Sequence, residues 1–337
     1  MSETPGAAAS RRSKPHDAYL GYIYIGLAAV LWGISASLGR AAFTERLLPG
    51  SGIRNVSPLI LSQARTTFSF LLVLVALLIR RGWRQLRLPW HDLLRVIILG
   101  LFGVAASNYF YYLAIQRTNV ATAIIVQYTA PIWVLLYMVA RGFERATLSK
   151  IASVFLAITG IALVIGLFGQ GRLHIDGLGL AAAVIASFSF TFYNIGGHYV
   201  LSKYDRWIVL LLTTMAASLF WMIVNPPTKI AAAHYSATAW LFLVIFAMLS
   251  LLLPFSLYFA GLQHLEPTKA IVASCLEPVF TVLIAAIALK EVVRPMQGVG
   301  IAMVLCAILV VQIPARVDSC LHAPTRSRPL AQWISAV

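Results

Sequence analysis

The chain has 337 residues, of which 60% are hydrophobic and only 11% are charged, and its mean hydropathy is +0.84. A water-soluble domain carries about 25% charged residues, so this composition excludes a soluble globular protein and indicates a chain that crosses a membrane several times. The formal net charge is +15. The basic residues lie between apolar segments and form no basic face with interleaved aromatic residues, which excludes nucleic acid as a partner.

The apolar residues fall into ten segments, and crossing the hydrocarbon core as a helix takes about 20 residues. In chain order the segments are 19–39, 58–79, 93–115, 119–140, 147–168, 177–199, 207–225, 236–262, 267–289 and 295–313. We therefore predict an all-α membrane protein with ten transmembrane helices. The first segment is too long for the core of a signal peptide, so we expect the protein to retain it.

Lysine and arginine are unevenly distributed over the connections between these segments. If the N-terminal tail is cytoplasmic, the inner segments hold 16 of these residues and the outer segments hold eight, with four arginines in residues 80–87 alone. Basic residues favour the cytoplasmic side. We therefore predict a multi-pass protein of the plasma (inner) membrane whose two tails, 1–18 and 314–337, are both cytoplasmic.

A weak self-match relates the two halves of the chain. Residues of uncommon type recur at a spacing of 147, namely Pro131 with Pro278, Glu144 with Glu291, and Gln116 with Gln263. Dividing ten spans at the connection near 169–176 leaves five in each half, and an odd number makes the second half enter the membrane from the opposite side. The sequence therefore predicts two inverted five-helix repeats, 19–170 and 171–313, an arrangement typical of alternating-access carriers.

Two ionisable residues fall within predicted spans, where a charge is costly and needs an explanation. Glu277 lies ten residues into its span from Pro267, about 15 Å along a helix and thus near the midplane. It could bind and release a proton or pair with a substrate cation; alternatively it is satisfied by a neighbour and only orients its helix. Arg65 is interpreted either as an anchor at the outer interface or as a counter-charge for Glu277 or a substrate carboxylate.

Three prolines lie inside spans: Pro131, Pro254 and Pro278. Proline removes a backbone hydrogen bond and kinks a helix. A kink at Pro131 would free the carbonyl of Gln127, which adjoins Tyr128, and a kink at Pro278 would free the carbonyl of Ser274. Both kinks could expose polar backbone to a central cavity. The alternative is kinking for packing alone. Pro254 kinks the eighth span and has no proline partner in the first half.

Aromatic and polar residues supply the remaining candidates for substrate contacts. Asn108 and Tyr112 lie towards the outer end of the third span, where the alternative is an interfacial aromatic belt. Trp32 lies deeper in the first span, and Tyr193 and Asn194 lie in the sixth. Aromatic walls suit planar or amphipathic compounds through stacking or cation–π contacts. This pattern favours amino acids, aromatic compounds or drug-like compounds as substrates.

Three stretches carry a resemblance to a known family: Leu265 to Ala270 continuing through Leu276-Glu277-Pro278-Val279-Phe280 to Lys290-Glu291, Gly26 to Gly33, and Gln63-Ala64-Arg65. They resemble, respectively, the closing signature, the opening helix and the membrane arginine of EamA-type carriers in the drug/metabolite transporter superfamily. The resemblance covers residues 19–313 and implies ten helices in two inverted repeats. The chain departs from the family in its long 40–57 loop, and in having its nearest aromatic, Phe68, three residues beyond Arg65.

Other functional classes lack their motifs in this sequence. No histidine cluster exists, and Cys275, Cys306 and Cys320 have neither metal-ligand nor disulfide-framework spacing. Esterase, metalloprotease and phosphate-binding-loop motifs are absent. We therefore predict a secondary-active exporter of small metabolites that works by alternating access, with no cofactor or metal and with the proton as a candidate coupling ion. A monomer suffices because one chain holds both halves. The alternative is a passive facilitator, channel or scramblase with the same fold.

Overall fold

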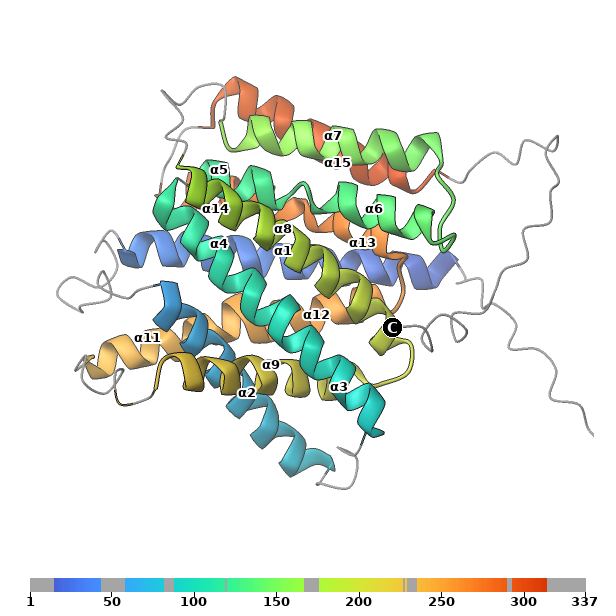
Figure 1. Ribbon diagram of the computed structural model, residues 1–337. Helices are drawn as coiled ribbons and strands as arrows, with labels where there is room; N and C mark the ends of the chain where they lie inside the picture. The colour runs from blue at the N-terminus through green and yellow to red at the C-terminus, as the bar shows by residue number, and fades with distance from the viewer. Residues whose placement is uncertain are drawn as a thin grey trace, which may run out of the picture.

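The computed structural model describes residues 15–43, 58–81, 88–118, 120–166, 176–226, 228, 235–289 and 293–313. Within these ranges the regular structure is helical throughout (Figure 1). In chain order the helices are α1 (Pro15–Phe43), α2 (Pro58–Arg81), α3 (Trp90–Ile98), η3 (Leu99–Ala105), α4 (Ala106–Arg117), α5 (Val120–Gln127), α6 (Ala130–Ala140), α7 (Leu148–Val164), α8 (Gly177–Leu201), α9 (Arg206–Val224), α11 (Ala237–Ala247), η4 (Met248–Leu252), α12 (Leu253–Leu262), α13 (Pro267–Ser274), α14 (Leu276–Leu289) and α15 (Pro295–Val311).

Eight helical stretches in the described ranges are long and apolar enough to cross a membrane. Two further apolar helices, α7 and α15, have 17 residues each, which corresponds to about 25 Å. These stretches fall on the ten segments predicted from the sequence. The prediction of an all-α membrane protein is therefore confirmed, with eight candidate spans and two shorter apolar helices in the described ranges.

Helix bounds recur at the spacing found in the sequence. Both bounds of α15 lie 147 residues after those of α7. The π-helical segments η3 and η4 interrupt the third and eighth predicted spans, and their last residues, Ala105 and Leu252, are again 147 apart. η3 contains no proline, so the first half has a helix irregularity matching the one before Pro254 without a matching proline. The self-match thus extends from residue types to local backbone structure.

The fourth and ninth predicted spans are each broken near their middle. α5 ends at Gln127 and α6 begins at Ala130, while Cys275 separates α13 from α14. Pro131 and Pro278 are the second and third residues of the segments that follow the breaks. A proline in the first turn of a helix lacks an N–H that would be unpaired there anyway. The predicted kinks therefore take the form of breaks just upstream of each proline.

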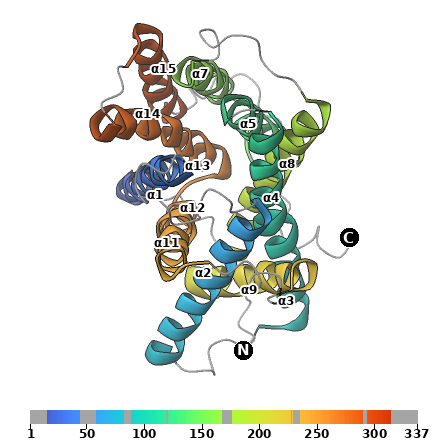
Figure 2. The same cartoon turned by 90° about the vertical axis from the view of Figure 1, so that its left-hand side faces the viewer.

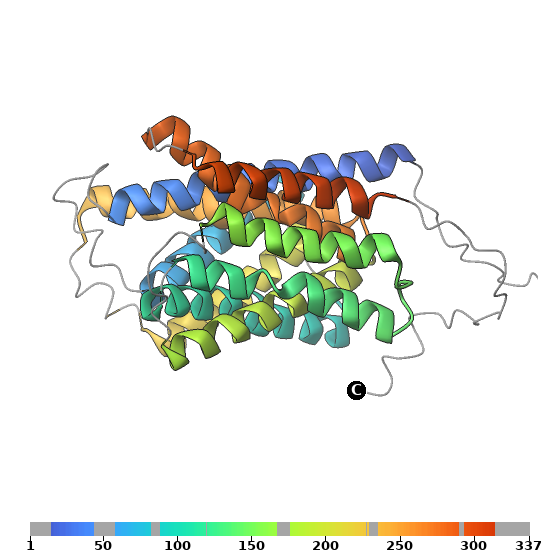
Figure 3. The ribbon, with the colours of Figure 1, turned by 90° about the horizontal axis from the view of Figure 1, so that it is seen from above.

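The bundle has two distinct ends. Three contacts bring together the start of α1, the start of α7, the start of α13 and the end of α15. A Cβ on Gly21 would lie 2.7 Å from Leu265, Lys150 pairs with Glu266 at 2.9 Å, and Ser149 donates to the carbonyl of Ile313 at 3.4 Å. This end lies on the right in Figures 1 and 3. The described chain therefore begins and ends its path at the same end of the bundle.

Viewed along the helices (Figure 2), α1, α12 and α13 face α4, α5 and α8 across the middle of the bundle. The main helix pairs are α1 with α12 and α14, α2 with α9, α4 with α8, and α7 with α15. All five of these pairs join the first half of the chain to the second. The interior thus belongs to both halves, and any site between them draws residues from distant parts of the sequence.

The α7–α15 pair depends on two glycines that let the backbones meet. A Cβ on Gly300 would lie 2.6 Å from the carbonyl oxygen of Gly160. We expect Gly300→Ala to force these helices apart and to lower the free energy of unfolding by about 1–3 kcal/mol. Gly298→Ala is the control, because nothing lies within 4 Å of a Cβ there. Thermal unfolding in detergent measures the effect; equal midpoints for the two variants would contradict this packing argument.

Candidate functional site

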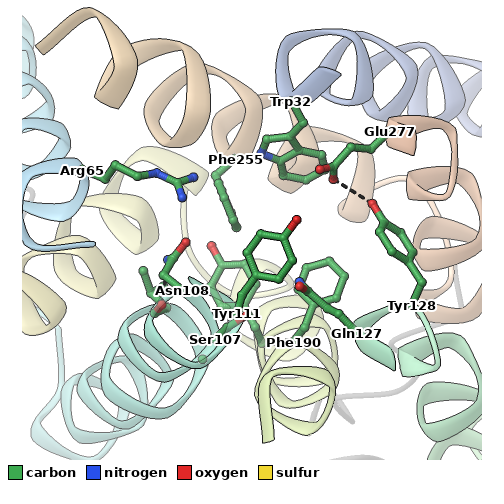
Figure 4. A pocket seen from close by; sticks show the side chains of 13 residues that line it. Trp32, Arg65, Ser107, Asn108, Tyr111, Gln127, Tyr128, Phe190, Phe255 and Glu277 are labelled. Carbon is green, nitrogen blue, oxygen red and sulfur yellow. Dashed lines mark hydrogen bonds between the residues drawn. The ribbon is translucent and has the colours of Figure 1, made fainter. Parts of the chain in front are cut away.

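A cavity of about 80 Å³ lies between the facing helices. On this measure a water molecule needs about 10–15 Å³, so the cavity holds several waters or part of a small metabolite. Figure 4 shows its side chains converging from both halves of the chain. The lining residues are Trp32, Arg65, Gly103, Val104, Ser107, Asn108, Tyr111, Gln127, Tyr128, Phe190, Tyr193, Phe255 and Glu277.

Arg65 supplies the positive charge of the cavity. It is 6% exposed and lies seven residues after the first residue of α2, about 10 Å along the helix. Its guanidinium donates to the hydroxyl of Tyr112 and to the carbonyl of Ser250 at 2.7 Å. It also lies over the rings of Tyr112 and Phe246. A guanidinium held in this way is fixed inside the bundle and is not an exposed interfacial anchor.

Glu277 supplies the negative charge from the opposite wall. It is the second residue of α14, so its carboxylate lies near the positive end of the helix dipole. The hydroxyl of Tyr128 donates to its Oε2 at 2.7 Å. The break between α5 and α6 places Tyr128 there, directly after the last residue of α5. The two broken helices therefore contribute the carboxylate and its hydrogen-bond donor.

The two charges enter the cavity from opposite sides. Figure 4 shows Arg65 on one wall and Glu277 on the other, with the hydroxyl end of Tyr111 directed into the space between them. Arg65 bonds to Tyr112 and Ser250, and Glu277 bonds to Tyr128. The charges therefore have separate protein partners, and a molecule in the cavity can contact both.

Aromatic rings form the apolar walls. Trp32 meets Phe255 edge to face, with ring centroids 5.2 Å apart. Phe255 in turn packs edge-on against Tyr193 at 5.4 Å. Edge-to-face contacts of this kind fix ring orientation as well as excluding water. The cavity therefore combines rigid apolar surface with charged groups at two ends.

Within the part of the chain that the structure describes, three buried polar atoms of lining residues have no hydrogen-bond partner. They are Nε of Arg65, Oε1 of Gln127 and the hydroxyl of Tyr193. Nearly all buried polar groups in proteins are hydrogen-bonded, and each exception needs an explanation. The Arg65 Nε is a hydrogen-bond donor, the Gln127 Oε1 is an acceptor, and the Tyr193 hydroxyl can be either. The polar groups of these lining residues are therefore only partly satisfied by the protein itself.

The structure brings together most of the residues singled out from the sequence. Seven of those ten substrate or coupling candidates line the cavity, namely Trp32, Arg65, Asn108, Gln127, Tyr128, Tyr193 and Glu277. Three lie outside the lining. Tyr112 stands behind Arg65 as its acceptor, Asn194 accepts from the hydroxyl of Tyr258 at 2.6 Å, and Ser274 donates to the carbonyl of Ile271 at 2.7 Å.

Six lining residues were not candidates from the sequence: Gly103, Val104, Ser107, Tyr111, Phe190 and Phe255. Helical spacing could have found several of them. Val104 and Tyr111 lie four residues before and three after Asn108, and Phe190 lies three before Tyr193, so each pair shares a helix face. The sequence offered no comparable signal for Phe255.

Trp32 and Tyr128 give the first prediction for this site. We expect Trp32→Ala and Tyr128→Ala to raise the apparent KM about tenfold while changing protein abundance little. The reason is that each removes a wall or a hydrogen bond of the cavity, worth about 1–2 kcal/mol to a ligand. Initial transport rates, normalised to the amount of protein in the membrane, measure this. Lower abundance at an unchanged KM would mean that both residues serve packing alone.

The profile of the EamA-like transporter family matches residues 19–166 and, a second time, residues 177–313. The chain belongs to this family. It is therefore a membrane transporter of the drug/metabolite transporter superfamily, as its resemblance to EamA-type carriers implied. The relatives it matches are transporters and not enzymes.

Two curated relatives are similar over most of their length. The chain is 21% identical over 300 residues to the uncharacterized inner membrane transporter YicL of Salmonella typhimurium strain LT2, covering 88% of this chain and 96% of that protein. It is 25% identical over 297 residues to the threonine/homoserine exporter RhtA of Escherichia coli K12, covering 88% and 94%. A solved crystal structure shares the fold with a TM-score of 0.68 at 19% identity, covering 89% of this chain and 98% of that one.

Proposed function

We propose that this transporter is a secondary-active exporter of small amphoteric metabolites, with amino acids as the first class to test. The observation that carries the proposal is the placement of Arg65 and Glu277 on opposite walls of one aromatic-lined cavity. A molecule with a carboxylate at one end and an ammonium at the other would neutralise both buried charges together. A substrate with only one charge would leave the other without a ligand partner, which is costly.

The guanidinium of Arg65 in the cavity lining supports a substrate carboxylate at that wall. Charge-assisted hydrogen bonds to a fixed guanidinium are among the strongest that proteins make. An ammonium group would pair with Glu277, and an apolar or aromatic side chain would pack on Trp32 and Phe255. RhtA, similar to this chain over 88% of its length, is named as an exporter of two amino acids. That name is also the basis for proposing outward transport.

We propose the proton as the coupling ion, with Glu277 as its binding group. A carboxylate that holds a proton no longer attracts an ammonium, so proton and substrate would compete for the same oxygens. Alternation of the two ligands at one group couples an inward proton to an outward substrate. The Tyr128 hydroxyl supports this role because it can donate to the ionised carboxylate and accept from the protonated one.

Alternating access requires a frame that can open at either end. We propose ten transmembrane helices in two inverted repeats, 19–170 and 171–313, that rock against each other. The double family match and the recurrence of helix bounds at a spacing of 147 support the duplication. The excess of lysine and arginine in the inner segments supports a cytoplasmic location for both tails, 1–18 and 314–337. One chain then supplies both repeats, so we propose a monomer.

Counterflow in proteoliposomes tests the proposed function. Vesicles loaded with one unlabelled amino acid, nucleoside or organic cation are diluted into a trace of the same compound in labelled form. A carrier accumulates label transiently, saturates with concentration and responds to an imposed pH gradient. Flux that neither saturates nor exchanges would identify a passive facilitator or channel. Lipid movement across the bilayer without solute flux would identify a scramblase.

A further inference from the structure

Lys150, in the first turn of α7, is a buried cation that the cavity does not use. Its side chain is 10% exposed, and its ammonium lies 2.6 Å from Oε2 of Glu144 and 2.9 Å from Oε2 of Glu266. Burial of an ammonium is costly unless carboxylates pair with it. Lys150 therefore needs at least one of these two partners in every conformation that keeps it buried.

The two partners belong to different halves of the chain. Glu144 follows α6 in the first family match, whereas Glu266 immediately precedes α13 in the second. Glu144 also crosses between the halves, because its Oε1 accepts from the backbone N–H of Thr268 at 3.3 Å. That N–H lies at the N-terminus of α13, where a negative charge is favoured. Lys150 and Glu144 together hold the start of α13 against α7.

The two carboxylates differ in exposure. The side chain of Glu144 is 2% exposed and that of Glu266 is 49% exposed. Burial acts to raise the pKa of Glu266, but the hydrogen bond and charge of Lys150, aided by Lys269, hold that pKa below its usual value. Glu266 is thus ionised at neutral pH. Water can replace Lys150 at Glu266 but not at Glu144, so the exposed bridge is the one that can open.

This cluster joins the two halves of the chain at one end of the bundle. It lies where α1 begins and α15 ends, on the right in Figure 1, and Leu265 packs against Gly21 beside it. The cavity lies between the two ends, since Arg65 is about 10 Å from the start of α2 and Glu277 is about 15 Å from the start of α13. The chain runs from this cluster along α6 and α13 to the breaks beside Tyr128 and Glu277, so the cluster joins the two broken helices at the ends away from those breaks.

We propose that Lys150 is a gating residue of this transporter, whose bridge to Glu266 keeps one end of the bundle closed and must break in each transport cycle. This inference rests on the alternating-access mechanism proposed above. Glu144 keeps Lys150 paired when the bridge is broken, so the gate opens without stranding a buried charge. The Lys150 ammonium then has a carboxylate partner whether the gate is closed or open, and only the exposed carboxylate of Glu266 changes its contacts.

Spin-label distances in the full-length protein in lipid nanodiscs test this gate without any substrate. The labels are placed on Ala146→Cys and Gln263→Cys, two exposed positions beside the cluster on either half, with Cys275, Cys306 and Cys320 replaced by serine. Lys150→Met and Glu266→Gln each remove the bridge. Lys269→Met is the matched control, because Lys269 contacts Glu266 only within one segment, at 3.4 Å.

We expect the fraction of molecules with the longer distance between the two labels to grow about threefold or more in Lys150→Met and in Glu266→Gln. In Lys269→Met this fraction should equal that of the unmodified chain. Lys150→Arg should preserve the unmodified distribution. Unchanged distances in Glu266→Gln, which retains the buried Lys150–Glu144 pair and its support for folding, would overturn the proposal. An equal change in Lys269→Met would also overturn it. Counterflow decides separately whether the protein is a carrier, so the two failures are distinguishable.

Discussion

Replacing Glu277 with glutamine is expected to abolish proton-linked transport while the protein still folds and inserts. Glutamine keeps the shape of the side chain and can still accept from Tyr128, which donates at 2.7 Å in the structure. It cannot change its charge. The variant therefore loses the proton site and the partner of a substrate ammonium, and a charge-assisted hydrogen bond of about 1.5–3 kcal/mol corresponds to a loss of about 10- to 100-fold.

The measurement is substrate flux in proteoliposomes with and without an imposed pH gradient. Tyr128→Phe is the matched variant, because it removes the donor but leaves the carboxylate. We expect it to shift the pH dependence of transport and to retain measurable flux. If Glu277→Gln shows the same pH-dependent flux as the unmodified protein, Glu277 has no coupling role and only orients its helix.

Composition and segment length were sufficient to predict the membrane fold. Every predicted span coincides with an observed helical stretch, because the chain must satisfy its backbone hydrogen bonds internally wherever it meets lipid. The internal spacing of 147 residues anticipated matched helices as well as matched residues, as the bounds of α7 and α15 illustrate. These features depend on local sequence and on the solvent alone.

The cavity was only partly predictable. Charges within predicted spans pointed to Glu277 and Arg65, because ionisable groups are costly in lipid. The position of Tyr128 near Pro131 pointed to that residue. Which aromatic residues face inward did not follow from the sequence. Tyr109 packs on Trp221 at 5.4 Å, whereas Tyr111 lines the cavity. Lipid-facing and core-facing positions are both apolar, so helix amphipathicity carries little information about the interior.

The ion-pair cluster around Lys150 was not predicted from the sequence, for a different reason. Its members stand at span ends, where basic and acidic residues are ordinary and indicate the interface. Lys269, near the start of the ninth predicted span, is one such residue, and it lies 3.4 Å from Glu266. The informative fact is the burial of Lys150 and Glu144, which results from packing between segments more than 100 residues apart in the chain.

Arg65 gives the sharpest test of substrate chemistry. We expect Arg65→Lys to raise the KM of carboxylate-bearing substrates about tenfold or more and to leave analogues with an amide in place of the carboxylate almost unaffected. Lysine keeps the charge, but its single ammonium cannot reach Tyr112, the carbonyl of Ser250 and a ligand in the geometry of the guanidinium. Arg117→Lys is the control, because Arg117 is exposed at the end of α4.

Combining Arg65→Lys with Glu277→Gln separates the two ends of the substrate. If a zwitterion bridges the cavity, substrates lacking the carboxylate should respond only to Glu277→Gln, and substrates lacking the ammonium only to Arg65→Lys. The double variant should then weaken zwitterion binding by less than the sum of the two single effects, because a substrate that has lost one anchor is free to reorient. Equal loss for amide and carboxylate substrates in Arg65→Lys would instead mean that Arg65 holds α2 against α4 and η4 through Tyr112 and Ser250.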